Sequence, residues 1–249
     1  MLHAVTMTKR LLLAAIPIAL ILGTAPALAS APTGTGAGAT PRVLFRVVED
    51  SGRIAVDSSA WGNDGDLRGG VTRDEGAYRL HPGLPHDRIR VEPDPSLNPD
   101  DDRFVYGAAV RVQPEAVWQH DEMAVIRHGD IDTPGGDYKL ELEQTNRDTV
   151  TAFCAMHDGS GGSGFVKGDG QLATIDDGQW HTIRCSREPA AQTVSLTIDG
   201  FTVSRPDKSL GSIVGADPLL IGVQPGQDGT GLREQFAGRM DNIRLAVGS

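Results

Sequence analysis

The sequence has little of what nucleic-acid-binding and sugar-stacking proteins commonly use. Aromatic residues make up 5% of its 249 residues, and 23 lysines and arginines stand against 33 aspartates and glutamates. The basic residues form no cluster, and phosphate binding depends on such clusters. The composition therefore disfavours nucleic acid and anionic membrane surfaces as partners. The formal charge of −10 is typical of a soluble protein, and an acidic surface also attracts Ca²⁺.

A long apolar run occurs once, near the start of the chain. Lys9 and Arg10 precede an apolar run over residues 11–22, and an Ala-Leu-Ala site follows it. This order is typical of a secretory signal peptide, and the run is too short for a comfortable membrane span. We therefore predict a signal peptide over residues 1–29, no membrane insertion, and a secreted, extracellular protein after cleavage near Ala29. Removing that segment leaves 21 basic against 33 acidic residues, a formal charge of −12.

The rest of the sequence has no sustained helical periodicity and no internal repeat. Residues 30–41 are small, uncharged and rich in Gly, Pro and Thr, which predicts a flexible leader. Apolar residues then recur at every second position in short runs that Gly and Pro separate, most regularly over residues 104–112. We therefore expect residues 42–249 to form one all-β domain, a two-sheet antiparallel sandwich.

The clearest strand signals lie over residues 176–203. Thr193–Ile198 alternates apolar and polar side chains, and Asp199-Gly200 supplies the two positive φ angles of a type I′ hairpin turn. In the run before them, Trp180 has the opposite parity to Ile183. We therefore expect a bend or a bulge where that strand begins.

Several short motifs follow one another in a characteristic order. They are Asp57-Ser-Ser-Ala-Trp-Gly-Asn-Asp-Gly65, Pro95-Ser-Leu-Asn98, Tyr138-Lys-Leu-Glu-Leu142, the run DGQWH with its following hairpin, Pro218-Leu-Leu-Ile-Gly222 and Phe236-Ala-Gly-Arg-Met-Asp-Asn-Ile-Arg244. Their order resembles the laminin-G-like branch of the concanavalin A-like lectin/glucanase superfamily. The resemblance implies a jelly-roll β-sandwich and places Trp180 at a core position. In such a sandwich the first strand, Val43 to Val48, lies near the C-terminal strand.

Inward positions of the expected strands predict the core. Met240 is out of phase with Ile243 and Leu245 in the last strand, which predicts a β-bulge at Asp241-Asn242. The predicted core residues are Phe104, Tyr106, Val110, Leu140, Leu142, Ile183, Leu196, Ile198, Leu220, Ile221, Phe236, Ile243 and Leu245.

The two cysteines, Cys154 and Cys185, both lie in expected strands. An exported protein with an even number of cysteines is expected to form disulfides, so we predict one bond between them. Two separate buried thiols are the alternative. A catalytic cysteine is disfavoured because no Cys/His signature accompanies either residue.

Motifs for common catalytic chemistry are absent from the sequence. It has no H-E-x-x-H, no G-x-S-x-G and no G-K-[ST], so zinc hydrolysis, a nucleophile elbow and a P-loop are unsupported. Retaining glycosidases of the superfamily that the motifs resemble carry E-x-D-x-x-E on one strand. Only Glu141 and Glu143 form a comparable pair, and the third carboxylate is missing. We therefore predict no catalytic residues and expect both glutamates to be solvated.

The resemblance also implies a candidate Ca²⁺ site, since related domains often hold this ion in loops at the rim of the sandwich. The oxygen-rich residues in matching positions are Asp57, Asn63, Asp64 and Asp241. The alternative is that Asp57 and Asn63 only accept hydrogen bonds from turn amides. Ca²⁺ is thus the one cofactor that the sequence suggests.

The resulting expectation is a secreted, non-catalytic recognition module that binds a glycan or an extracellular protein. A polysaccharide-active glycosidase or lyase of the same superfamily is one alternative, and a purely structural extracellular domain is another. An exposed tryptophan beside a groove, either Trp61 or Trp118, would favour sugar binding. Carboxylates that converge in the groove would favour an enzyme.

Overall fold

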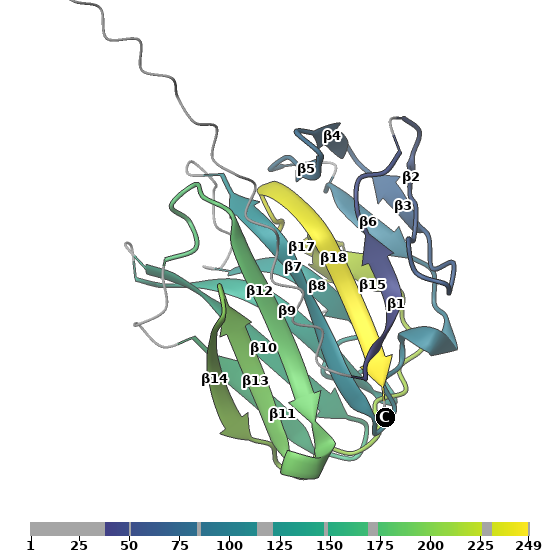
Figure 1. Ribbon diagram of the computed structural model, residues 1–249, viewed down its shortest axis with the longest axis vertical. Helices are drawn as coiled ribbons and strands as arrows, with labels where there is room; N and C mark the ends of the chain where they lie inside the picture. Colours follow the sequence, from purple (N-terminus) through teal and green to yellow (C-terminus); the bar gives the residue numbers. More distant parts are fainter. Residues whose placement is uncertain are drawn as a thin grey trace, which may run out of the picture. The chain divides into compact units, whose positions relative to one another are not determined.

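The computed structural model describes residues 38–49, 51–83, 86–113, 122–146, 149–168, 174–225 and 231–248. All of them belong to one compact unit, Gly34–Ser249 (Figure 1). The predicted signal peptide, most of the predicted leader and Trp118 lie outside the described residues. No helix in the described ranges is long and apolar enough to cross a membrane.

One of the two large sheets, here sheet A, contains the C-terminal strand. Its strands hydrogen-bond in the order β14-β13-β12-β7-β18-β5-β4, and β1 pairs with β18. Their bounds are β1 Thr40–Phe45, β4 Thr72–Asp74, β5 Ala77–Leu80, β7 Arg103–Val112, β12 His181–Glu188, β13 Thr193–Ile198, β14 Phe201–Pro206 and β18 Gly238–Gly248.

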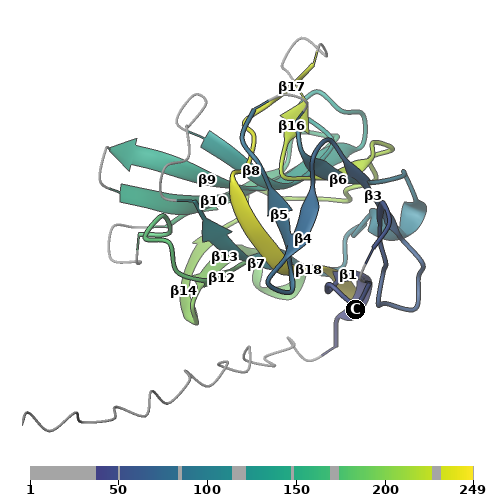
Figure 2. The same ribbon diagram turned by 90° about the horizontal axis from the view of Figure 1, so that it is seen from above.

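The second sheet, here sheet B, has the order β11-β10-β9-β8-β15-β6-β3-β2. Its strands are β2 Ile54–Ala55, β3 Gly65–Arg68, β6 Arg88–Val91, β8 Glu122–His128, β9 Gly136–Asn146, β10 Thr149–Asp158, β11 Ser163–Lys167 and β15 Leu219–Ile221. Short elements complete the fold: β16 Gln224–Pro225 pairs with β17 Leu232–Arg233, and two 3-10 turns are η1 Pro95–Leu97 and η2 Pro189–Ala191. The pairs are antiparallel, which confirms the predicted two-sheet antiparallel sandwich (Figure 2).

The first and last strands lie side by side, as expected. Thr40 pairs with Val247 and Phe45 with Ile243, so β1 extends sheet A along β18. The bounds of this strand differ from the expected Val43–Val48, because β1 begins at Thr40, within the predicted leader, and ends at Phe45. Thr40 and Pro41 form part of a strand although their composition suggests a flexible segment, because their backbone pairs with β18.

The hairpin between β13 and β14 forms as predicted, with φ values of 50° at Asp199 and 89° at Gly200. The expectation for Trp180 is wrong. β12 begins at His181, pairs with β7 and β13 without a register shift over its described residues, and leaves Trp180 42% exposed. The inward position belongs to His181, whose ring nitrogens lie 2.7 Å from Asp199 Oδ2 and 3.0 Å from Asp177 Oδ1.

The core contains twelve of the thirteen residues that the sequence assigns to it, and all thirteen are at most 6% exposed. The exception is Leu220, which alternates with Leu219 and Ile221 in β15 and is buried outside the core cluster. Its centre includes an aromatic group in which the Phe104 ring lies 4.9 Å from Tyr106 and 4.7 Å from Tyr138. The bulge in β18 is also confirmed. The register shifts between Asp241 and Arg244, and this shift allows Met240 to be buried with the rest of the core.

A disulfide joins the two sheets. Cys154 in β10 is bonded to Cys185 in β12, with 5.8 Å between their Cα atoms. Beside it, the Tyr106 hydroxyl reaches across the sandwich and donates to the Lys139 carbonyl at 2.8 Å. The predicted bond is therefore confirmed, and it fixes sheet A against the strands of sheet B that carry the polar groove described next.

Candidate functional site: a polar groove on sheet B

The outer face of sheet B carries charged side chains that are unusually well buried. In β9, Tyr138, Leu140 and Leu142 point into the core, so strand alternation places Asp137 and Glu141 on the opposite face. Both are nevertheless almost inaccessible, at 0% and 1% exposure. A charged group is rarely buried so fully on a solvent-facing sheet, and this marks the face as a candidate site.

A groove with a volume of about 580 Å³ runs over this face. One wall continues from β17: the Ala124 amide of β8 donates to the Glu234 carbonyl at 2.8 Å, which fixes Glu234 beside the sheet. Glu234 is fully buried and has a left-handed φ of 53°. The groove is lined by Glu122, Arg127, Asp130, Ile131, Asp132, Asp137, Lys139, His157, Gln224, Arg233 and Glu234.

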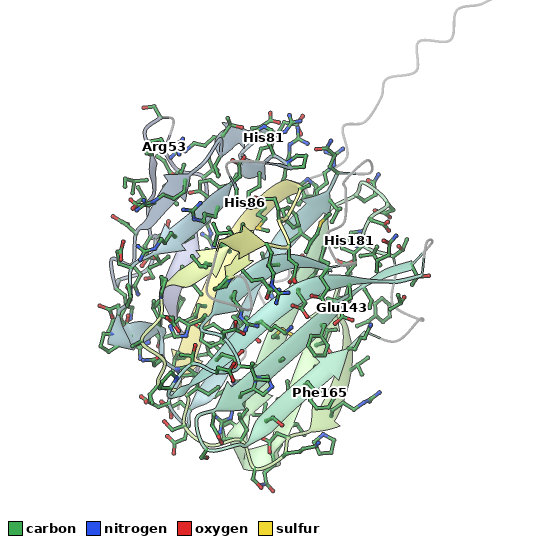
Figure 3. The ribbon with its side chains drawn as sticks, turned by 180° about the vertical axis from the view of Figure 1, so that it is seen from behind. Arg53, His81, His86, Glu143, Phe165 and His181 are labelled. Atoms are coloured by element: carbon green, nitrogen blue, oxygen red, sulfur yellow. A yellow bond between two sulfur atoms is a disulfide. The ribbon has the colours of Figure 1, made fainter. Side chains whose placement is uncertain are left out.

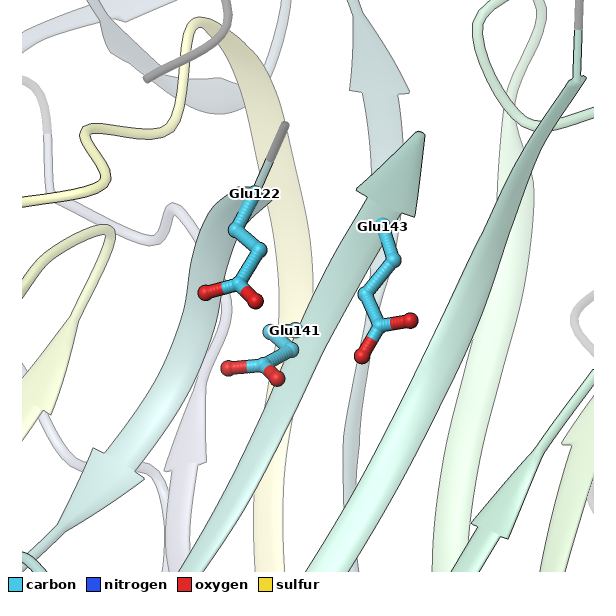
Figure 4. A group of neighbouring side chains, drawn as sticks. All are labelled: Glu122, Glu141 and Glu143. Atoms are coloured by element: carbon cyan, nitrogen blue, oxygen red, sulfur yellow. The ribbon is translucent and has the colours of Figure 1, made fainter. Parts of the chain in front are cut away.

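Three glutamates gather at one end of this face. Glu122 of β8 lies opposite Glu143 of β9, and Glu141 lies two residues from Glu143 on the same face. One oxygen from each lies within 4.8 Å of the others (Figure 4). The expectation that Glu141 and Glu143 are merely solvated is wrong for Glu141, because neighbouring side chains cover it.

A fourth carboxyl group, that of Glu234, lies close enough to Glu122 for the two to interact. Burial and the negative charge of Glu122 raise the pKa of Glu234 to about 8. Burial also raises the pKa of Glu141, although the ammonium of Lys139, which donates to Glu141 Oε1 at 2.6 Å, opposes the shift. The cluster can therefore hold a proton at neutral pH.

The other end of the groove contains a histidine–aspartate pair. Nδ1 of His157 lies 2.8 Å from Asp137 Oδ1, and the second oxygen, Oδ2, is 3.6 Å from the Arg127 guanidinium. Arg127 also donates to Asp130 and to the Gly129 carbonyl. This network fixes the His157 ring at the groove wall, with one-quarter of the side chain accessible.

Two phenylalanines lie on the strands next to β9, outside the lining of the groove. The rings of Phe153 in β10 and Phe165 in β11 are 6.4 Å apart, and Phe165 is 51% exposed. Figure 3 shows Phe165 and Glu143 on the same side of the molecule. Of the tryptophans that the sequence suggests for sugar stacking, Trp61 is 49% exposed, but the Arg42 guanidinium covers its ring at 3.7 Å.

The carboxylates among the candidate Ca²⁺ residues already accept hydrogen bonds from the protein. Asp57 Oδ1 accepts from the Leu44 and Ser59 amides, and Oδ2 accepts from the Ser59 hydroxyl and the Asn63 amide. Asp64 in turn accepts from the Asp57 amide. Asp241 instead accepts from Asn242 on β18. These contacts favour the turn-capping alternative for Asp57, whose oxygens already have two donors each.

Sequence reasoning missed Glu122, Glu234, Asp137 and the role of His157. Glu122 and Asp137 sit at outward positions of strands and resemble ordinary solvated charges. Glu234 lies in a short irregular segment with no motif. Only Glu141 and Glu143, which face outward from β9, gave a sequence signal. Whether they are solvated or buried depends on residues distant in sequence that pack over them.

Comparisons with known proteins agree with this architecture. A family model described as the Laminin G domain matches residues 153–246, which confirms the resemblance to laminin-G-like domains. No curated protein matches the chain in sequence. The chain is thus a β-sandwich with a polar groove on one face, and residues 153–246 of it are similar to the Laminin G domain.

Solved structures of toxin binding domains share the fold. The binding domain of Paraclostridial Mosquitocidal Protein 1 matches with a TM-score of 0.63 and 17% identity, over 85% of this chain and 49% of that one. The binding domain of botulinum neurotoxin DC in complex with SialylT matches with a TM-score of 0.57 and 10% identity, over 83% and 47%. The same domain with rat synaptotagmin II gives 0.58 and 9%, over 84% and 48%. The chain therefore spans about half the length of these structures.

Proposed function

We propose that this domain is a secreted recognition module that binds a glycan in the groove on sheet B. The observation that carries the proposal is the groove itself, which presents buried charged side chains around a volume of about 580 Å³. Small-molecule sites commonly have volumes of 300–1,000 Å³ and a few fixed polar groups. A sugar has hydroxyls that can use such groups and an apolar face that can stack on Phe165.

The fold neighbours support a binding role. These neighbours are binding domains, one in complex with SialylT and another in complex with rat synaptotagmin II. A glycan suits the groove better than a protein does, because the polar groups lie in a narrow depression. The disulfide and the predicted signal peptide support an extracellular location. A rim Ca²⁺ site at Asp57, Asn63, Asp64 and Asp241 remains a proposal.

A glycan array, run with and without Ca²⁺, tests this function. Phe165→Ala should weaken binding of the selected glycan by about tenfold, since it removes a stacking surface. Phe201→Ala is the matched control, because Phe201 is 71% exposed at the hairpin of sheet A. Binding that both variants reduce equally, or no binding to any glycan, would contradict the proposal.

Glycoside hydrolysis is a second candidate, and one observation favours it. Carboxyl groups converge at the groove: Glu122, Glu141 and Glu143 each have an oxygen within 4.8 Å of the others, and the pKa of neighbouring Glu234 is raised to about 8. Retaining hydrolysis uses an acid and a carboxylate about 5 Å apart. Against it, Lys139 already pairs with Glu141. We expect no hydrolysis of β-glucans by the purified domain. Hydrolysis that Glu141→Gln or Glu143→Gln abolishes would establish the enzyme instead.

A further inference from the structure

We propose that the ligand of this groove carries a positively charged amino group, as in a glycan that contains unacetylated amino sugars, and that its ammonium binds among Glu122, Glu141 and Glu234. The inference rests on the proposed binding function of the groove and specifies its ligand class. Three properties of the groove and the adjoining glutamates support this inference. They are the surplus of negative charge, the buried acceptor oxygens without donors, and the proton that Glu234 holds at neutral pH.

The groove has a surplus of negative charge. Five carboxyl groups and three cationic side chains line it, and with a proton on Glu234 they carry four negative against three positive charges. Glu141, whose oxygen lies within 4.8 Å of one from Glu122, adds a further carboxyl group beside the lining. The cations are already paired: Arg127 with Asp130, Lys139 with Glu141 and Arg233 with Glu234. A semi-enclosed site with surplus charge of one sign concentrates ligands of the opposite sign. A sugar acid would add to the negative charge, so acidic glycans are expected to bind weakly.

The buried polar atoms left unused in the described part of the groove are acceptors. Oε2 of Glu141 receives no hydrogen bond, although the residue is only 1% exposed. Oδ2 of Asp137 also receives none, with Arg127 at 3.6 Å. A buried acceptor without a donor costs free energy, and a ligand that supplies donors removes that cost. An ammonium group has three donors and no acceptor, so it matches the acceptor of Glu141, while that of Asp137 offers a donor site at the other end of the groove.

Burial and the negative charge of Glu122 raise the pKa of Glu234 to about 8, so Glu234 holds a proton at neutral pH beside Glu122. Other charged groups that face the pair are Glu141 and Lys139 from β9 and Arg233 from β17. A ligand ammonium that binds there supplies one positive charge and can therefore replace the proton on Glu234. The proton then leaves to solvent as the ammonium binds, so the charge of the cluster is conserved.

Calorimetry of the intact domain tests this exchange. The probes are β-linked glucosamine oligomers, their N-acetylated counterparts and 1,4-diaminobutane, each titrated at mildly acidic pH in two buffers of different ionisation enthalpy. The amine-bearing oligomers should bind at least about tenfold more tightly than the acetylated ones. The difference in apparent enthalpy between buffers should correspond to the release of about one proton.

Two conservative variants locate the effect. Glu122→Gln and Glu234→Gln keep the shape and much of the hydrogen bonding, so each should bind the amine-bearing oligomer about tenfold more weakly and release no proton. Their affinity for the acetylated oligomer should be unchanged. Glu92→Gln is the matched control, since Glu92 is exposed and lies outside the groove lining.

The outcomes separate this inference from the proposed function. Equal affinity for both oligomers, or binding without proton release, overturns the inference and leaves glycan binding intact. Binding of 1,4-diaminobutane with proton release, but of no oligomer, supports the ammonium site and overturns glycan recognition. No binding of any probe overturns both.

Discussion

Glu234 lies beside Glu122, 112 positions earlier in the chain, and burial together with the negative charge of Glu122 raises the pKa of Glu234 to about 8. The pair forms because the segment after β17 is fixed beside β8, where the Ala124 amide donates to the Glu234 carbonyl. The burial of this pair has consequences for stability as well as for binding.

Glu234→Gln should change how stability depends on pH. The pKa of Glu234 is about 8 in the folded protein, and an unfolded glutamate titrates near 4.3. Between these values the native state holds a proton that the unfolded state has lost, so wild-type stability falls as pH rises. The slope from this group is at most about 1.4 kcal/mol per pH unit. In urea unfolding, the free energy of unfolding of the variant should rise relative to that of wild type as the pH is raised from 5 to 8. If the unfolding free energies of variant and wild type change with pH in parallel, the raised pKa of Glu234 is contradicted.

Loss of the disulfide should destabilise the sandwich without changing its topology. Cys154 and Cys185 are 31 positions apart, and closing a loop of that size stabilises a protein by about 3–4 kcal/mol in the chain-entropy model. The double variant Cys154→Ser/Cys185→Ser should lose an amount of that order in urea unfolding. Mass spectrometry of non-reduced wild type should yield one linked peptide pair. Two thiols that react with an alkylating reagent in native protein would contradict the bond.

Asp57→Ala should destabilise the loop between β2 and β3. The substitution removes the acceptor of four donors, including the Leu44, Ser59 and Asn63 amides. Leaving a buried donor unsatisfied costs about 1–3 kcal/mol, so we expect a loss of at least that size. Asp57→Asn is the control, since it keeps one acceptor oxygen and should lose less. Equal losses for the two variants would contradict the capping role.

The calcium proposal has its own test. If the rim binds Ca²⁺, millimolar Ca²⁺ should raise Tm and EDTA should lower it, and Asp241→Ala should remove both effects. A hundredfold excess over Kd corresponds to about 2.7 kcal/mol of stabilisation. A Tm indifferent to Ca²⁺ and EDTA would leave capping as the role of Asp57.

The sequence predicted the fold better than the site. Alternation identified the core strands, and the phase of Met240 identified the bulge in β18, because each signal is local to one strand. The prediction for Trp180 was wrong because it relied on a family position that suggested burial. In the structure His181 faces inward instead and contacts Asp177 and Asp199. The acidic cluster depends on which residues cover Glu141, and no local pattern contains that information.

Mapping the binding surface by amide chemical shifts tests the central claim most directly. A glucosamine oligomer is titrated into isotope-labelled domain, and the shifts of assigned amides are followed. The account predicts that the largest changes fall on β8, β9 and β10 around Glu122, Asp137, Glu141 and His157. Changes confined to the Asp57 loop or to the outer face of sheet A, with the groove amides unmoved, would contradict it.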